Sequence, residues 1–214
     1  MISRYCKYKK TFDRSFDKTY SNNFLFLNYM KRVYILECEN VESRPLFDLH
    51  KEMIGLLVEK PKVLVLLWTT NNRERIRKYM KIIDKYFRDL GAKEITFLDE
   101  NDEDYRRRFR NANILYLPGG STRIFLEKLR RKRIAEEIKH FRGIIIGNSA
   151  GAIVLSKIGY VYRGKEMIEY NGLGILNIKI IVHFKPEDIK ILKIEGNVIG
   201  IRDDSAVIFI EFGK

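Results

Sequence analysis

The sequence has few of the residues from which metal centres and disulfide frameworks are built. Its 214 residues include two cysteines, three histidines, four prolines and one tryptophan. Cys6 and Cys38 form no CxxC pair, and no group of Cys and His has metal-ligand spacing. This excludes zinc-ribbon domains and small disulfide-rich secreted scaffolds, and it favours a reducing, cytoplasmic compartment. We expect no bound metal.

Long apolar runs are also missing. No stretch approaches the roughly 18 apolar residues that cross a bilayer, and the N-terminus lacks the apolar core of a signal peptide. We therefore expect no association with membranes. The apolar fraction of 45% is ordinary for a globular protein with a sizeable core.

Acidic residues are outnumbered, 28 against 41 Lys and Arg, which leaves a net charge of +13. The basic groups concentrate at residues 106–110 and 130–133, among polar residues with helical spacing, which favours solvated helix faces. No recognisable nucleic-acid module accompanies them, so a nucleic-acid partner is not our expectation. A basic surface also attracts acidic substrates.

The chain divides near Met30. Residues 1–29 are basic, aromatic and polar with no sustained period, and we interpret them as a flexible N-terminal extension or as translation upstream of the true start at Met30. Residues 30–214 have the length and composition of a single domain.

Within that domain, short apolar strands alternate with helices of ten or more residues, which predicts βαβ units and a mostly parallel sheet covered on both faces. Short strands at close spacing follow after Ser156, and we expect them to add antiparallel strands to one sheet edge. The expected strands are 33–36, 63–67, 94–98, 114–117, 144–146, 161–162, 178–182, 191–195, 198–202 and 206–211. The expected helices are 46–57, 74–90, 104–110, 122–141 and one starting at 150.

The most informative segment is Gly147-Asn148-Ser149-Ala150-Gly151, a GxSxG motif between a buried strand and a helix. In this context the serine sits on a sharp, strained turn, and the glycines let strand and helix approach each other. The amide of Ala150 then points at the oxyanion that develops when the serine attacks a carbonyl. We predict that Ser149 is a nucleophile. The alternative is a plain glycine-rich turn, with or without a phosphate-binding role.

A nucleophilic serine needs a base, and the base needs an orienting acid. His183 follows an apolar strand and opens a loop, where catalytic residues of parallel sheets collect, so it is the predicted base. His50 and His140 lie on predicted helices and are interpreted as surface or half-buried structural residues. The candidate acids are Glu166, Glu169, Asp188, Asp203 and Asp204.

A second oxyanion donor is expected from a loop at the same sheet edge. The segment Leu117–Arg123, LPGGSTR, joins a strand to a helix through two glycines, and we assign the amide of Gly120 to this role. Ser121 has the alternative role of a helix N-cap. Arg123 and Arg163 are candidate partners for a substrate carboxylate, although both could equally be solvated arginines.

These motifs, in this order, resemble those of the dipeptidase E / cyanophycinase group of serine peptidases. The match spans roughly residues 110–210. The motifs are LPGGSTR (117–123), IIGNSAGA (145–152), NGLGIL (171–176), IVHF (181–184) and IGIRDDSAVIF (199–209).

The resemblance implies a three-layer, flavodoxin-like α/β fold related to class I glutamine amidotransferases, without metal or organic cofactor. It implies Ser149 as nucleophile, His183 as base, and the amides of Gly120 and Ala150 as oxyanion hole. In the dipeptidase branch the acid lies in an Asp-Met pair before the glycine-rich segment. Glu166-Met167 falls at the comparable place, so Glu166 is the preferred acid and Glu169 the next, with Glu in place of Asp as a departure.

We therefore expect a serine peptidase that hydrolyses small peptides, with aspartyl dipeptides as the substrate class that the resemblance implies. Three alternatives stay open: an esterase or amidase with the same triad, a catalytically weak binding protein of the same fold, and a nucleic-acid partner acting through residues 1–29. Edge strands in the last third could pair two protomers into a homodimer.

Overall fold

The computed structural model describes residues 6–7, 30–164, 166–187 and 194–212. The long strand β2 (Met30–Glu37) begins at the residue where the sequence predicts the domain to start. From the predicted extension, only β1 (Cys6–Lys7) is described, and it pairs with the C-terminal strand β11 (Ala206–Phe212). The rest of the predicted flexible extension lies outside the described residues.

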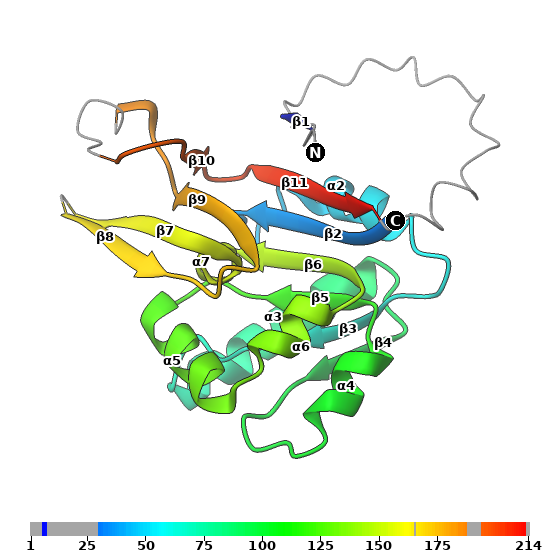
Figure 1. The fold of residues 1–214 in the computed structure, drawn as a ribbon. Helices are drawn as coiled ribbons and strands as arrows, with labels where there is room; N and C mark the ends of the chain where they lie inside the picture. Colours follow the sequence, from blue (N-terminus) through cyan, green and yellow to red (C-terminus); the bar gives the residue numbers. More distant parts are fainter. Residues whose placement is uncertain (1–5, 8–29, 165, 188–193, 213–214) are drawn as a thin grey trace, which may run out of the picture.

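The centre of the molecule is a seven-stranded sheet in the order β1-β11-β2-β6-β5-β3-β4 (Figure 1). The strands from β2 to β4 in this order run parallel, and β11 runs antiparallel to β2. The remaining parallel strands are β6 (Gly143–Asn148), β5 (Ile114–Leu117), β3 (Lys62–Val65) and β4 (Glu94–Phe97). The continuous apolar runs of the sequence form strands that are buried on both faces.

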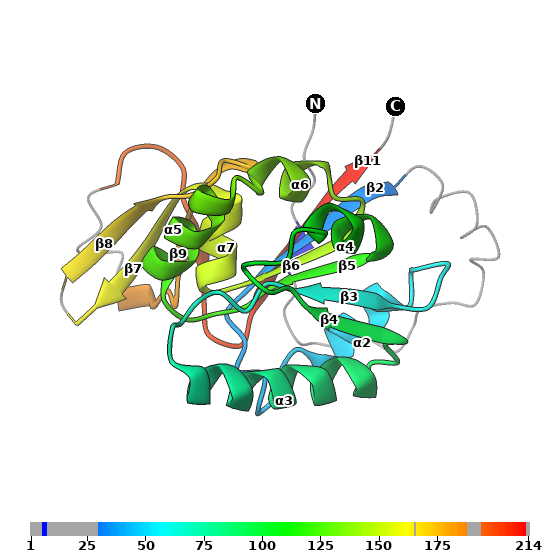
Figure 2. The same ribbon diagram turned by 90° about the horizontal axis from the view of Figure 1, so that it is seen from below.

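Helices cover both faces of this sheet, which confirms the predicted three-layer α/β class (Figure 2). One apolar cluster lies under α2 and α3, and the other lies under α4 to α7. The helices are α2 (Phe47–Ile54), α3 (Arg73–Asp89), α4 (Tyr105–Asn111), α5 (Thr122–Lys132), α6 (Ala135–His140) and α7 (Ala150–Leu155).

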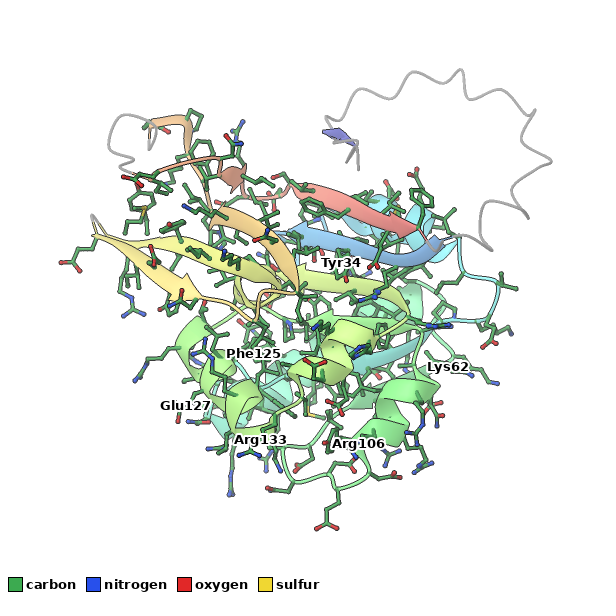
Figure 3. The ribbon with its side chains drawn as sticks, in the orientation of Figure 1. Tyr34, Lys62, Arg106, Phe125, Glu127 and Arg133 are labelled. Carbon is green, nitrogen blue, oxygen red and sulfur yellow. The ribbon has the colours of Figure 1, made fainter. Side chains whose placement is uncertain are left out.

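The single helix expected over residues 122–141 is two helices. Arg133 ends α5 in the left-handed region, at φ 54°, and the chain turns there before α6 begins. The turn lets Ile134 and Ile138 enter the same core as Phe125. In Figure 3, Phe125 lies between α5 and the sheet, whereas Arg133 and Arg106 point outward.

The last third of the chain adds antiparallel strands, as expected, but most of its strands form a second sheet instead of extending the main one. Only β11 joins the edge of the main sheet, while four strands form a second sheet in the order β10-β9-β7-β8. These are β7 (Ser156–Arg163), β8 (Glu166–Asn171), β9 (Leu176–Val182) and β10 (Ile199–Ile201). Strand β8 was not predicted. The β7–β8 pair is antiparallel, but β9 runs parallel to both β7 and β10.

The parallel pairing of β9 and β10 matters for the site. Ile201 of β10 lies beside Val182 of β9, so the residues that follow the two strands leave the sheet together. The first three residues of the strand expected at 191–195 lie outside the described residues, and residues 194–195 are not in a strand. Among the described helices, none has both the length and the apolar character that a bilayer span requires.

Candidate active site

Ser149 occupies the turn between β6 and α7, as the GxSxG motif predicts. Its backbone is in a strained conformation, with φ 49° and ψ −99°, which a non-glycine residue adopts at a cost of roughly 1–3 kcal/mol. The Ser149 amide donates to the carbonyl oxygen of Glu37 at 2.7 Å, and this bond holds the turn against the end of β2. Gly151 permits the close approach, because a Cβ there would lie 2.0 Å from the carbonyl oxygen of Leu117.

His183 meets the serine from the second sheet. It directly follows β9 with φ 57°, and its Nε2 lies 2.8 Å from Oγ of Ser149. Two backbone contacts fix its loop: the His183 amide donates to the sulfur of Cys38 at 3.4 Å, and the Phe184 amide donates to the carbonyl of Ile201 at 2.9 Å. The strand end thus places an imidazole against the predicted nucleophile.

The carboxylate beside His183 belongs to Asp203 and not to Glu166. Oδ1 of Asp203 lies 2.5 Å from Nδ1 of His183, so the predicted assignment of Glu166 is corrected by the geometry. Glu166 and Glu169 both lie on β8, which is separated from β9 by β7. At about 4.8 Å per strand, β8 runs roughly 10 Å from β9. Asp203 instead follows β10, the direct neighbour of β9.

The other candidate acids do not take this place either. Asp204, the next residue, has φ 55° in the turn before β11, and Asp188 lies outside the described residues. A sequence signal for Asp203 existed in the motif IGIRDDSAVIF. To use it, one would have had to know that residues 199–201 pair in parallel with the strand that ends at His183.

The loop predicted to carry the second oxyanion donor lies beside the nucleophile. A Cβ built on Gly119 would be 3.6 Å from Cβ of Ser149. Gly120 has φ 131°, and a Cβ there would collide with Oγ1 of Thr69 at 2.6 Å, so only glycine fits. The Ser121 amide donates to the carbonyl of Thr69 at 3.1 Å, and the Ser121 hydroxyl caps α5 by accepting from the Ile124 amide. The donor roles of Gly120 and Ala150 stay predictions.

The two candidate substrate-binding arginines are both exposed. Arg123 lies in the first turn of α5, immediately after the glycine loop. Arg163 ends β7, and the parallel register of β7 with β9 puts it at the same sheet end as His183, one strand away. Their role toward a substrate stays a prediction.

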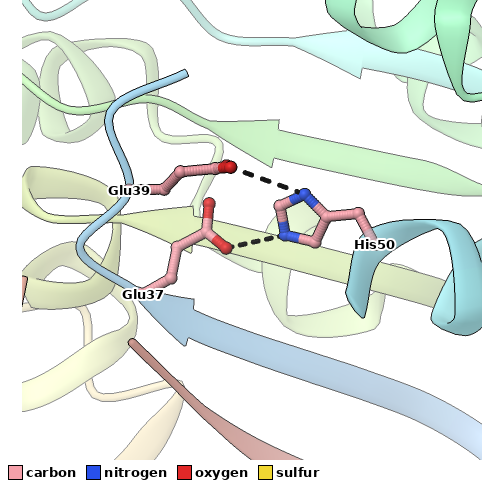
Figure 4. Close-up of side chains that lie close together, drawn as sticks. All are labelled: Glu37, Glu39 and His50. Carbon is pink, nitrogen blue, oxygen red and sulfur yellow. Dashed lines mark hydrogen bonds and ion pairs between the residues drawn. The ribbon is translucent and has the colours of Figure 1, made fainter. Parts of the chain in front are cut away.

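A second group of polar side chains lies buried next to the nucleophile turn, and sequence reasoning missed it. His50, expected at or near the surface, is fully buried together with Glu37. Its Nε2 lies 2.7 Å from Oε2 of Glu37, and its Nδ1 lies 2.6 Å from the hydroxyl of Tyr86. That hydroxyl donates to the carboxylate of Glu39 at 3.1 Å. Figure 4 shows His50 between the carboxylates of Glu37 and Glu39. We call Glu37, Glu39, His50 and Tyr86 the buried cluster.

Burial and mutual charge shift the pKa values in the buried cluster. Burial, followed by the charge of Glu37, raises the pKa of Glu39 to about 7. Burial opposes the charged form of His50, but the charge and hydrogen bond of Glu37 outweigh it and raise the His50 pKa. Nearby, burial raises the pKa of the Cys38 thiol to about 12, so this cysteine is not a nucleophile at neutral pH.

Within the described part of the chain, metal-ligand side chains gather only in this cluster. Ligand atoms of Glu37, Glu39 and His50 lie within 4.8 Å of one another. The two carboxylates, however, approach opposite nitrogens of the His50 ring, so a single ion at one ring nitrogen could not bind both directly (Figure 4). The arrangement suits hydrogen bonding and shared protons better than metal binding.

Comparisons with known proteins agree with this architecture. The sequence model of peptidase family S51 matches residues 39–212. An uncharacterized peptidase of Listeria monocytogenes, Lmo0363, is 24% identical over 152 residues, which cover 63% of this chain and 74% of the relative.

Two solved structures share the fold. A peptidase from an acI-B1 actinobacterium superimposes with a TM-score of 0.66 at 21% identity, over 86% of this chain and 85% of that one. A protein of Listeria monocytogenes EGD-e, provisionally assigned to peptidase E, superimposes with a TM-score of 0.62 at 20% identity, over 86% of this chain and 96% of that one.

Proposed function

Because the chain belongs to peptidase family S51, a family of serine-type peptidases, we propose that it hydrolyses short peptides through Ser149, His183 and Asp203. One observation carries this proposal. A hydroxyl, an imidazole and a carboxylate lie in line, 2.8 Å and 2.5 Å apart, on a strained turn at the end of the sheet. This is the arrangement that activates a serine for attack on a carbonyl.

The proposed reaction has two halves. Oγ of Ser149 attacks the peptide carbonyl carbon while His183 takes the hydroxyl proton, and the carbonyl oxygen becomes an oxyanion held by the amides of Gly120 and Ala150. His183 then gives the proton to the leaving amine as the C–N bond breaks. Water, deprotonated by His183, attacks the acyl-enzyme; as the ester bond breaks, His183 returns the proton to Oγ of Ser149 and the second product is released. Asp203 keeps Nδ1 of His183 protonated and balances the charge that the ring acquires.

We propose peptides with an acidic residue as the substrate class, aspartyl dipeptides first. The net charge of +13 attracts such substrates, and Arg123 and Arg163 flank the glycine loop and the strand end that carries His183. Each guanidinium can hold a carboxylate through two hydrogen bonds.

The test is hydrolysis of Asp-X dipeptides, β-aspartyl dipeptides, neutral dipeptides and nitrophenyl esters by wild type and Ser149→Ala side by side. We expect the wild type to cleave Asp-X fastest and the variant to cleave nothing. Cleavage of esters alone would keep the catalytic residues and overturn the peptidase proposal. Equal hydrolysis rates for wild type and Ser149→Ala would overturn the assignment of Ser149 as the nucleophile.

A further inference from the structure

The buried cluster is joined to the nucleophile turn through the backbone. Glu37 is the last residue of β2, and its carbonyl accepts the amide hydrogen of Ser149 at 2.7 Å. Two residues later, the side chain of Asn148 bonds the backbone of Glu39 twice: Nδ2 donates to the carbonyl at 2.9 Å, and Oδ1 accepts from the amide at 3.2 Å. The backbone of Glu37 therefore holds Ser149, and the backbone of Glu39 holds Asn148.

The side chains of the same two glutamates are held by the helices. Glu37 bonds His50 of α2, and Glu39 accepts from Tyr86 of α3 and from the Leu46 amide at 3.0 Å. Any change in the charge of these carboxylates therefore acts on the strand end that positions Ser149. The cluster and the nucleophile turn are joined by direct hydrogen bonds, without bridging water.

The buried cluster contains two groups that can become negative and one that can become positive. Glu37 and Glu39 face a single imidazole, and Oε1 of Glu37 is buried without a hydrogen-bond partner. From the other packed elements, the Tyr116 hydroxyl of β5 accepts from Asn148, and the Arg44 guanidinium lies 5.6 Å from the Tyr86 ring centre while pairing with Asp89. With both carboxylates ionised, one protonated His50 leaves a net charge of −1.

Building on the proposed function, we propose that Glu37, Glu39 and His50 are positioning residues for Ser149, and that loss of the proton on Glu39 slows acylation of the serine. When Glu39 ionises, its carboxylate and that of Glu37 repel each other. Both residues belong to the backbone segment whose hydrogen bonds hold Asn148 and Ser149. The raised pKa of Glu39, about 7, puts this change in the neutral range.

The experiment measures the rate at which a fluorophosphonate labels Ser149 between pH 6 and 9, by mass spectrometry of the intact protein. In this reaction Oγ of Ser149 displaces fluoride at phosphorus and the serine proton leaves through His183. For the wild type, we expect the rate to fall as the pH rises above about 7 and Glu39 loses its proton. The fall should be about tenfold, the scale for the effect of one added charge at an effective dielectric constant of about 20.

Three variants separate positioning from general damage. Glu39→Gln removes the titrating group, and the fall should vanish. Tyr86→Phe removes a hydrogen bond that lowers the Glu39 pKa, so the fall should move to higher pH. Tyr34→Phe is the matched control: it removes the hydroxyl of another buried tyrosine, on β2 but bonded to Arg32, and the profile should stay as in the wild type.

Identical pH profiles of the labelling rate for wild type and Glu39→Gln would overturn the inference. If Glu39→Gln does not fold, equal pH shifts of the profile in Tyr86→Phe and Tyr34→Phe would overturn it. A wild type that is not labelled at any pH would overturn the proposed function instead. The ¹H–¹⁵N signal of the Ser149 amide then tests the connection by itself. It should titrate with Glu39 in the wild type and stay constant in Glu39→Gln, and a constant signal in the wild type would refute the connection.

Discussion

In the described part of the protein, two hydrogen-bonded sets of a hydroxyl, an imidazole and a carboxylate differ chiefly in their surroundings. Ser149, His183 and Asp203 form one at the surface, where the side chains of His183 and Asp203 are 45% and 65% exposed. Tyr86, His50 and Glu37 form the other, with both side chains of its ion pair fully buried. The comparison teaches that, of the two sets, only the exposed one leaves its hydroxyl where a substrate could reach it, and this is the set that we propose as the reactive site. In the core, the other set binds elements together.

Removal of the two histidines should separate these roles most strongly. His183→Ala removes the proposed base, and kcat/KM should fall by about 10⁶, with little change in thermal stability because the side chain is half exposed. His50→Ala leaves Glu37 and Glu39 without their buried partner, and the free energy of unfolding should fall by about 3–5 kcal/mol. Peptidase assays and denaturant unfolding of both variants check this. A stable His50→Ala protein would contradict the structural role of the buried cluster.

The identity of the acid gives the next largest effect. Asp203→Asn should lower kcat by about 10⁴, because the orienting carboxylate at Nδ1 of His183 is lost. Glu166→Gln is the matched control on β8 and should stay within about threefold of the wild type, since it lies about two strands from His183. The measurement is kcat on the best peptide of the panel. The reverse order of the two effects would restore Glu166 as the acid.

Loss of one oxyanion donor should have a smaller effect. Gly120→Ala introduces a Cβ against Thr69 in a conformation with φ 131°, so the loop must shift and kcat should fall by about 10²–10³. Gly174→Ala is the control for backbone strain, because Gly174 also has a positive φ but no atom within 4 Å of the new Cβ. Equal losses of kcat in the two variants would mean that strain, and not the donor, is responsible.

The pH dependence of stability gives the smallest effect and reports on the buried cluster alone. Glu39 has an ordinary pKa of 4.5 when unfolded and about 7 when folded, so between these values the folded protein binds more protons. The free energy of unfolding should therefore fall as pH rises through this window, by on the order of 2–3 kcal/mol. The His50 pKa is also raised, which continues the fall above neutral pH. Denaturant unfolding at pH 5 and 8 should show a smaller difference in Glu39→Gln than in the wild type.

Much of the exposed site was predictable because its signals are local. A strand, a tight turn and a helix are adjacent in the chain around Ser149, and the glycine loop at Gly120 follows the same rule. His183 was found because it directly follows an apolar strand. Asp203 was one of the candidate acids but was not the preferred one, because its nearness to His183 depends on the pairing of β9 with β10, which no local pattern reveals. The buried cluster combines β2, α2 and α3, and none of its members carries a motif.

The sequence by itself determined the α/β class, the strained serine turn and the histidine that follows a strand, because short-range periodicity and turn chemistry specify these features. Only the tertiary structure decided which carboxylate meets His183, how the last strands divide between two sheets, and that His50 is buried. Strand order and register cannot be read from local pattern, since any of several apolar strands could pair with β9. A polar residue on a helix likewise becomes buried or exposed according to what the rest of the chain packs against it.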